Sequence, residues 1–276
     1  MIYLNGAFMP AEQARIDPFD RGFSLGDGLF ETLRAYDGRP FRLADHLARM
    51  AAAATALEIP LPVDMPAVAA AVTELLGANG HGQGDASIRI TLSRGTGPRG
   101  LAPPEDPQPT LLIATAGYAR LPDTCTALTV DIHRNEGSPL SRMKSLGALD
   151  NVLAAGLAAK RGAEEAILAN NAGCIACGAR ANLFALIDGR LVTPPISDGV
   201  LPGIARRVVL EIAAVKRLSF EEASLRPADL TRAEEILLTN SLFEVRSVAR
   251  LDGRALGSRT LGDKLRAEYR EMTRLG

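Results

Sequence analysis

The sequence contains few of the residues that mark secreted, membrane or nucleic-acid-binding proteins. Three cysteines are too few to indicate a disulfide framework. The net charge of −1 provides no basic surface for nucleic acid or anionic lipid. The apolar runs are much shorter than a membrane span, and the first residues lack a charged segment followed by an apolar one. We therefore expect a cytoplasmic protein with no membrane or nucleic-acid partner.

Two of the three cysteines suggest an alternative function, in thiol redox chemistry or zinc binding. Cys174 and Cys177 form a Cys-x-x-Cys pair, which admits a redox centre or half of a zinc site. A thioredoxin-type pair lies at the start of a helix, whose dipole lowers the pKa of a thiol, whereas this pair lies between two short strand-like runs. Zinc needs about four ligands, and neither Cys125 nor the three histidines show ligand spacing. We expect no metal site, and a thiol oxidoreductase stays open as an alternative.

The hydrophobic patterning predicts alternating short strands and helices. Asn-Gly or Asp-Gly pairs at positions 5–6, 37–38 and 188–189 are typical of hairpin turns. Helical spacing covers residues 43–57, 65–76, 148–160 and the part of 200–218 that follows Pro202-Gly203, and strand-like runs cover residues 29–36, 86–92, 111–115, 166–169 and 235–239. A chain of 276 residues is long enough for two domains. We place a small N-terminal α/β domain over residues 1–116, a linker over 117–123 and a larger C-terminal α/β domain, which carries Lys144, over 124–276.

Lys144 stands shortly before the helical pattern of residues 148–160 and ahead of a hairpin-like segment. A lysine in such a position can hold an aldehyde cofactor as a Schiff base. The same spacing fits a solvated surface charge. The lysine is therefore a candidate that other motifs have to support.

Two further segments could bind anionic groups. Residues 93–107 form a Gly- and Pro-rich loop that carries Arg94 and Arg99. The loop is either a mobile surface connection or a substrate lid, and its arginines either bind a carboxylate or are solvated. Pro202-Gly203 precedes a helical pattern whose first backbone N–H groups could bind phosphate. Asn240-Ser241 could complete that site, and ordinary turn chemistry is the alternative.

Seven segments follow one another along the chain: DRGFSLGDGLFETLR, FRLADHLARM, SRGTGPRG, MKSLGALDNVLA, ANLF with TPP, LPGIAR and EEILLTNS. Together they resemble the fold-type IV pyridoxal-phosphate enzymes, among them the class IV aminotransferases and 4-amino-4-deoxychorismate lyase. The resemblance covers roughly Asp20 to Leu251. It implies two α/β domains, pyridoxal 5′-phosphate in the cleft between them, and a homodimer in which the partner chain completes each cleft.

The resemblance also assigns roles to matching residues. Lys144 would be the Schiff-base lysine and the proton shuttle, and Arg49 would bind the cofactor phosphate. Backbone N–H groups of Ile204 and Ala205 would bind the same phosphate. The cofactor-binding positions are then Arg49, Lys144, Cys177, Ile204, Ala205, Asn240 and Ser241. Thr32 and Arg99 fall where the family contacts substrate or cofactor, and Arg94 and Arg180 are further candidates for a substrate carboxylate.

Three positions depart from the family pattern. Counting back five residues from Asn182 gives Cys177, where the family usually has a Glu that keeps the pyridine nitrogen protonated. Without that carboxylate the electron sink should weaken, unless Cys177 acts as a thiolate. Ala148 stands where a Tyr usually walls the site, and Ala205 stands where a Thr hydroxyl usually contacts phosphate.

The departures favour the lyase among the family's activities. The lyase expels pyruvate and leaves 4-aminobenzoate, a folate precursor, and aromatisation supplies much of its driving force. The histidine of the Arg-x-His pattern found in D-amino-acid transaminases is absent, because the loop reads Arg99-Gly100-Leu101. A class IV transaminase acting on D-amino acids, branched-chain amino acids or amines is the alternative. A non-catalytic or weakly active relative is a hypothesis of another class.

Overall fold

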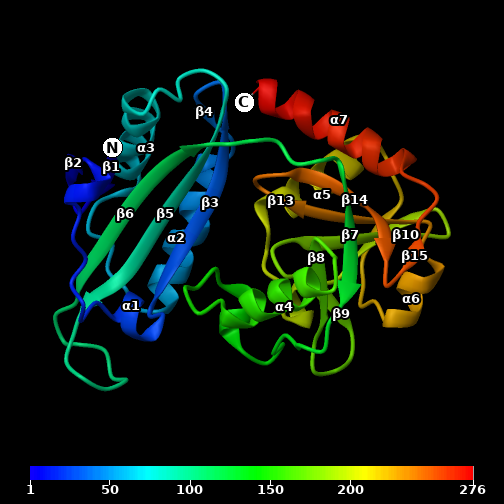
Figure 1. Cartoon of the computed structure of the whole chain (residues 1–276), viewed down its shortest axis with the longest axis horizontal. Helices are drawn as coiled ribbons and strands as arrows, with labels where there is room; N and C mark the ends of the chain where they lie inside the picture. Colours follow the sequence, from blue (N-terminus) through cyan, green and yellow to red (C-terminus); the bar gives the residue numbers. More distant parts are fainter. Residues whose placement is uncertain (276) are drawn as a thin grey trace. The chain divides into compact units, whose positions relative to one another are not determined.

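The computed structural model describes residues 1–275 as two compact units (Figure 1). Unit 1 comprises residues 1–119 together with 143–147, and unit 2 comprises residues 120–142 and 148–275. The boundary falls inside the predicted linker. Among the helices of residues 1–275, none combines the length and the apolar character that a membrane crossing requires.

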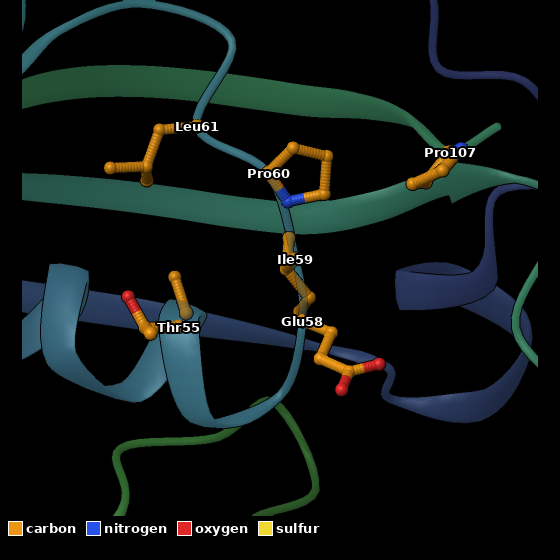
Figure 2. Close-up of a pocket in the computed structure, with 7 residues that line it drawn as sticks. Thr55, Glu58, Ile59, Pro60, Leu61 and Pro107 are labelled. Atoms are coloured by element: carbon orange, nitrogen blue, oxygen red, sulfur yellow. The ribbon is translucent and has the colours of Figure 1, made fainter.

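Unit 1 is built on an antiparallel sheet with the order β2-β1-β6-β5-β3-β4. Its strands are β1 (Ile2–Leu4), β2 (Ala7–Met9), β3 (Gly28–Tyr36), β4 (Arg39–Pro40), β5 (Asp85–Thr96) and β6 (Gln108–Gly117), and its helices are α1 (Arg21–Leu25), α2 (Leu43–Ala56) and α3 (Met65–Ala78). A pocket of about 540 Å³ lies where the chain leaves α2, between residues 54–61 and Pro107 (Figure 2).

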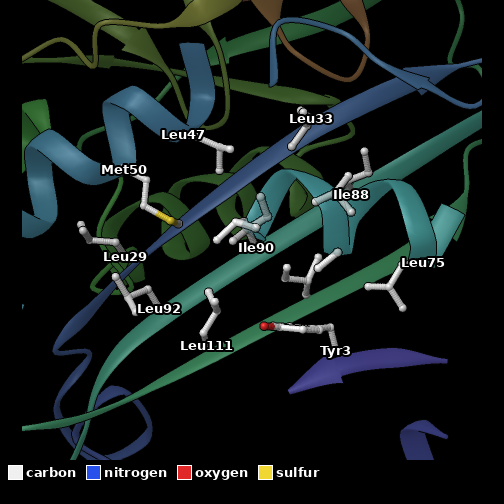
Figure 3. Packing of buried hydrophobic residues seen from close by; sticks show 14 of the residues in the cluster. Tyr3, Leu29, Leu33, Leu47, Met50, Leu75, Ile88, Ile90, Leu92 and Leu111 are labelled. Carbon is white, nitrogen blue, oxygen red and sulfur yellow. The ribbon is translucent and has the colours of Figure 1, made fainter. Parts of the chain in front are cut away.

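The core of unit 1 lies between the sheet and helices α2 and α3 (Figure 3). Alternate residues of β5, from Ala86 to Leu92, are fully buried on this side. Leu29 and Leu33 of β3 pack on the same side against Leu47 and Met50 of α2. Because side chains alternate across a strand, the residues between them in sequence belong to the opposite face of the sheet.

Unit 2 contains a mixed nine-stranded sheet with the order β12-β11-β10-β13-β14-β7-β8-β9, and β15 pairs with β14. Its strands are β7 (Thr124–Thr129), β8 (Glu165–Ala169), β9 (Ile175–Gly178), β10 (Asn182–Ile187), β11 (Arg190–Thr193), β12 (Phe220–Glu222), β13 (Glu235–Asn240), β14 (Glu244–Leu251) and β15 (Arg254–Ala255). Its helices are α4 (Leu149–Lys160), α5 (Ile204–Val215), α6 (Pro227–Arg232) and α7 (Thr260–Leu275).

The segment 143–147 is the main difference from the predicted domain division. We predicted Lys144 in the C-terminal domain, but its segment pairs with β3 of unit 1 as a short added strand. The backbone N–H of Phe30 donates to the carbonyl of Lys144 at 2.9 Å, and the N–H of Leu146 donates to the carbonyl of Gly28 at 2.9 Å. A Cβ on Gly28 would lie 2.7 Å from Leu146 Cδ1 and 2.5 Å from the carbonyl oxygen of Leu92. Glycine is therefore required where the two segments meet.

Candidate active site

Lys144 extends from the added strand to the aromatic ring of Phe30, with Nζ 4.4 Å from the ring centroid. Burial lowers the pKa of Lys144 to about 8; the Glu31 carboxylate opposes the shift, and the charges of Arg49 and Arg89 add to it. A lower pKa leaves more neutral amine near neutral pH, and the neutral amine is the nucleophile. The structure thus gives Lys144 the property that a carbonyl-binding lysine needs.

This property makes a pH dependence testable. We expect the apoprotein to take up pyridoxal phosphate faster as pH rises, with a midpoint near 8, because uptake requires the neutral Lys144 amine. Well above that midpoint the rate should level off. Stopped-flow absorbance across the alkaline range measures it. A rate that still climbs steeply at a pH of about 10 to 11, as for an ordinary lysine, would contradict it.

A buried ion-pair cluster lies beside Lys144. Arg49 of α2 binds Glu31 of β3 through two hydrogen bonds, from Nε to Oε1 at 2.8 Å and from Nη2 to Oε2 at 2.7 Å. His46 Nδ1 lies 2.6 Å from Glu31 Oε2, and both side chains are 1% exposed. Burial would raise the pKa of Glu31, but hydrogen bonds from His46 and Arg49 and the charge of Arg49 hold that pKa below its ordinary value. Glu31 is therefore an ionised buried carboxylate.

His46 is neutral in this cluster. Burial lowers the pKa of His46, and the Glu31 carboxylate only partly opposes the shift. A neutral imidazole can still donate from Nδ1 when the proton sits on that nitrogen. The short contact therefore assigns the Nδ1–H tautomer, with Nδ1 donating to Glu31.

Arg89 and Thr32 lie on the face of the sheet opposite the core. The two residues pair across β3 and β5. Arg89 Nη1 donates to Thr32 Oγ1 at 3.3 Å, and Arg89 Cζ lies 3.5 Å from the centroid of the Phe30 ring. Phe30 is thus in contact with both Arg89 and Lys144. A guanidinium beside the reactive amine can orient an anionic substrate group.

The two loop arginines have different surroundings. Arg94 is 5% exposed, and its Nε donates to Asp27 Oδ2 at 2.9 Å. Its Nη1 and Nη2 donate to the carbonyls of Glu58 and Leu57, each at 2.8 Å. The predicted substrate role does not fit this environment, because every guanidinium nitrogen of Arg94 donates a hydrogen bond to a backbone carbonyl or to Asp27. Arg99 is exposed on the loop and is still available as a candidate.

Ile204 and Ala205, the predicted phosphate-binding residues, are the first two residues of α5 in unit 2. The first N–H groups of a helix have no acceptor within the helix, and those of Ile204 and Ala205 belong to this set. Both residues are buried. A Cβ on Gly203 would lie 1.9 Å from Asn182 Oδ1, so only glycine fits there. A close-fitting turn before a buried helix start is a suitable site for an anion.

Asn240 is committed to the turn after β13. Its Oδ1 accepts from the N–H groups of Leu242 and Phe243, each at 2.9 Å, and its Nδ2 donates to the carbonyl of Arg180 at 3.1 Å. The side chain of Asn240 therefore shapes the turn that carries Ser241. Any direct phosphate contact from this pair falls to Ser241 or to the backbone.

Cys177 lies in β9, inside a small apolar cluster with Ala176, Val200 and Ile196. Burial raises the pKa of the Cys177 thiol to about 11; Arg134 opposes the shift and Glu165 adds to it. The idea that Cys177 acts as a thiolate is therefore wrong at neutral pH. The three cysteines are free and buried, so the Cys-x-x-Cys pair lacks the exposed thiol of a redox centre.

Arg180 follows Cys177 closely in sequence and is about half exposed. Its Nε donates to Glu165 Oε2 at 3.1 Å, and its Nη2 donates to the carbonyl of Glu164 at 2.8 Å. Burial raises the pKa of Glu165 despite the charge of Arg180. Glu165 belongs to β8, the strand that pairs with the strand of Cys177.

Sequence reasoning missed Glu31, His46 and Arg89. A signal for the first was available, because Glu31 occupies a core-facing position between Leu29 and Leu33 in an alternating strand. A buried charge needs partners, and His46 and Arg49 are spaced three residues apart on one helix face. Arg89 gave no signal, since exposed arginines on strands are common.

The model of the family described as Amino-transferase class IV matches residues 28–251. The chain belongs to the class IV aminotransferase family. It is 31% identical to a D-alanine aminotransferase of Staphylococcus haemolyticus, over 95% of this chain and 92% of that protein. It is 30% identical to an aminodeoxychorismate lyase of Bacillus subtilis, over 94% of this chain and 89% of that protein.

Solved structures agree with the family assignment. A branched-chain aminotransferase of Thermoproteus uzoniensis with norvaline gives a TM-score of 0.93 at 28% identity, covering 99% of this chain and 94% of that one. A second branched-chain amino acid aminotransferase, complexed with N-(5′-phosphopyridoxyl)-L-glutamate, gives a TM-score of 0.90 at 26% identity, covering 99% and 93%. The predicted two-domain α/β fold of type IV is confirmed.

This class IV protein is an enzyme that depends on pyridoxal 5′-phosphate. The residues present fit that cofactor. Lys144 offers an amine with a lowered pKa, Arg49 offers a guanidinium in a fixed orientation, and Ile204 and Ala205 offer the first backbone N–H groups of α5.

Proposed function

We propose that this class IV enzyme is a 4-amino-4-deoxychorismate lyase, which eliminates pyruvate and leaves 4-aminobenzoate. The observation that carries the proposal is the neutral, buried thiol of Cys177 at the position where the family usually has a carboxylate. A thiol that stays protonated cannot hold a positive charge on a pyridine nitrogen. A reaction that gains its driving force from aromatisation depends least on that charge.

Lys144 would perform the proton transfers. When bound, pyridoxal phosphate supplies an electron sink for the carbanion that forms next to the substrate amine. Lys144 Nζ would hold the cofactor aldehyde, release it to the substrate amine and then accept the proton from the carbon that bears the amine. The resulting ammonium at Nζ could return that proton to the departing three-carbon group. Its pKa of about 8 suits both directions of transfer.

The cofactor phosphate would be held by charge and by backbone donors. Arg49 contributes the guanidinium, and Ile204 and Ala205 contribute N–H groups at the start of α5. Ser241 would add contacts from the turn after β13. The methyl side chain of Ala205 removes the hydroxyl contact that a threonine would give, but the N–H group at that position is retained.

Arg89 is our candidate for a substrate carboxylate, with Thr32 beside it and Arg99 and Arg180 as the other candidates. Arg89→Leu should raise KM by roughly 10- to 100-fold, because a charge-assisted hydrogen bond is lost, while kcat changes less. Arg89→Lys keeps the charge and serves as the matched control. Steady-state kinetics test this, and an unchanged KM in Arg89→Leu would remove Arg89 from the site.

We also propose that the enzyme is a cytoplasmic homodimer. On α4, Leu149, Val152 and Leu153 are 69%, 63% and 54% exposed. Their spacing places three large apolar side chains on one helix face, and an exposed apolar patch of this kind marks an interaction surface. Sedimentation velocity should give twice the chain mass of 29.2 kDa; a monomer at micromolar concentration would contradict the proposal.

A transaminase is the second candidate, favoured by the similarity to D-alanine and branched-chain aminotransferases. A panel of D-amino acids, L-amino acids and amines with 2-oxoglutarate separates the two activities. The lyase proposal expects kcat/KM for every pair to be at least about 100-fold below that for 4-amino-4-deoxychorismate, a difference of roughly 2.7 kcal/mol in transition-state stabilisation. A donor that matches the lyase substrate would overturn it. A non-catalytic or weakly active relative would show little or no turnover in the lyase assay and in the transaminase assay.

A further inference from the structure

We propose that Glu31, held in turn by His46, is a positioning residue that fixes Arg49 for the phosphate of the cofactor. The inference rests on the cofactor of the family and does not depend on whether the enzyme is a lyase or a transaminase. Neither Glu31 nor His46 is placed in contact with substrate.

The geometry of the pair fixes the plane of the guanidinium. Glu31 engages Nε and Nη2 of Arg49 with both carboxylate oxygens, at 2.8 and 2.7 Å. Two parallel hydrogen bonds of this kind fix the orientation of the guanidinium, which a single bond would not. The direction of Nη1, which belongs to the same rigid plane, is therefore also fixed by Glu31.

His46 fixes the carboxylate itself. Its Nδ1 lies 2.6 Å from Glu31 Oε2, the same oxygen that accepts from Arg49 Nη2. His46 and Arg49 are three residues apart on α2, so one helix face supplies both partners of Glu31. Since both Glu31 and His46 are 1% exposed, the carboxylate of Glu31 has little freedom to rotate.

Charge balance supplies a second reason for the carboxylate. Arg49, Arg89 and Lys144 bring three cationic groups into one region, and each arginine acts to lower the pKa of Lys144. Glu31 is the anionic group that opposes them. The cluster keeps Arg49 beside the reactive lysine while the carboxylate offsets the repulsion.

A purely structural ion pair between α2 and β3 is the competing explanation. That explanation predicts that the loss of Glu31 lowers the affinity for every ligand of the site by the same factor. A positioning role predicts a loss confined to ligands that carry the phosphate. Pyridoxal, which has the aldehyde and ring but no phosphate, separates the two explanations.

The experiment measures dissociation constants of the full-length apoprotein for pyridoxal phosphate and for pyridoxal by absorbance titration. Glu31→Gln keeps the side-chain size and removes the charge. We expect its affinity for pyridoxal phosphate to fall roughly 10- to 100-fold and its affinity for pyridoxal to fall no more than about threefold. In an Arg49→Leu background, Glu31→Gln should cause no further phosphate-specific loss.

The histidine variants keep the test valid if Glu31→Gln fails to fold. His46→Asn places an amide N–H near the position of Nδ1 and should bind pyridoxal phosphate like the wild type, whereas His46→Leu should show the phosphate-specific loss.

Asp85→Asn breaks the separate ion pair with Arg34 in the same unit and is the matched control for stability alone. Equal losses for both ligands, or no loss in either Glu31→Gln or His46→Leu, would overturn the proposal. Because binding is measured without substrate, failure of the lyase proposal would leave this result unaffected.

Discussion

Replacement of Lys144 by alanine is expected to lower turnover by roughly 10⁴-fold or more, because the variant loses both the group that holds the cofactor aldehyde and the general base. The added strand, residues 143–147, pairs with Gly28 and Phe30 of β3. Lys144 is the one lysine among these five described residues. The variant should still bind pyridoxal phosphate weakly through the phosphate site. Absorbance of the bound cofactor and product formation are the two measurements.

Lys160→Ala is the matched control, since Lys160 is exposed at the end of α4. It should keep both the cofactor spectrum and the activity of the wild type. Loss of a general base should lower the rate by at least about 100-fold. A Lys144→Ala enzyme that retains more than about a tenth of wild-type activity would therefore show that another group transfers the proton.

Cys177→Glu is expected to shift the balance of activities toward transamination. A carboxylate at this position would hold the pyridine nitrogen in its protonated form, and returning a proton to the cofactor carbon depends more on that charge than expelling pyruvate does. We expect transaminase kcat/KM to rise roughly tenfold or more, equivalent to about 1.4 kcal/mol of transition-state stabilisation, while the lyase rate changes less.

Size has to be separated from charge in this test. Glutamate is larger than cysteine, and the cluster with Ala176 and Val200 is closely packed, so overpacking could cost roughly 1–3 kcal/mol of stability. Cys177→Gln has the same size and no charge. Equal transaminase rates in the glutamate and glutamine variants would show that the charge at position 177 does not control the partition between the two reactions.

Local chemistry explains why much of the fold could be predicted from the sequence. Asn5-Gly6 and Asp37-Gly38 adopt positive φ angles, of 47° and 96° and of 47° and 74°, at hairpin turns as predicted. The apolar spacing of residues 43–57 and 65–76 matches α2 and α3 within two residues. Hairpin turns and amphipathic helices depend on residues that are close in sequence, so the sequence pattern predicts them.

Features that depend on distant pairing could not be predicted in the same way. Nothing near Lys144 in sequence shows that its segment pairs with β3, which lies far earlier in the chain. The composition of residues 93–107 fitted either a mobile surface connection or a substrate lid, but neither alternative anticipates that Arg94 is buried against Asp27 and two carbonyls after α2. An arginine's role depends on which groups surround it, and that information is tertiary.

The measurement that tests the lyase proposal most directly supplies the cofactor-loaded enzyme with 4-amino-4-deoxychorismate and no keto-acid acceptor. The proposal predicts 4-aminobenzoate and pyruvate in equal amounts, at a rate that added 2-oxoglutarate does not change and that Lys144→Ala abolishes. Absence of both products from protein whose absorbance shows bound cofactor, or product that forms only when an acceptor is added, would contradict it.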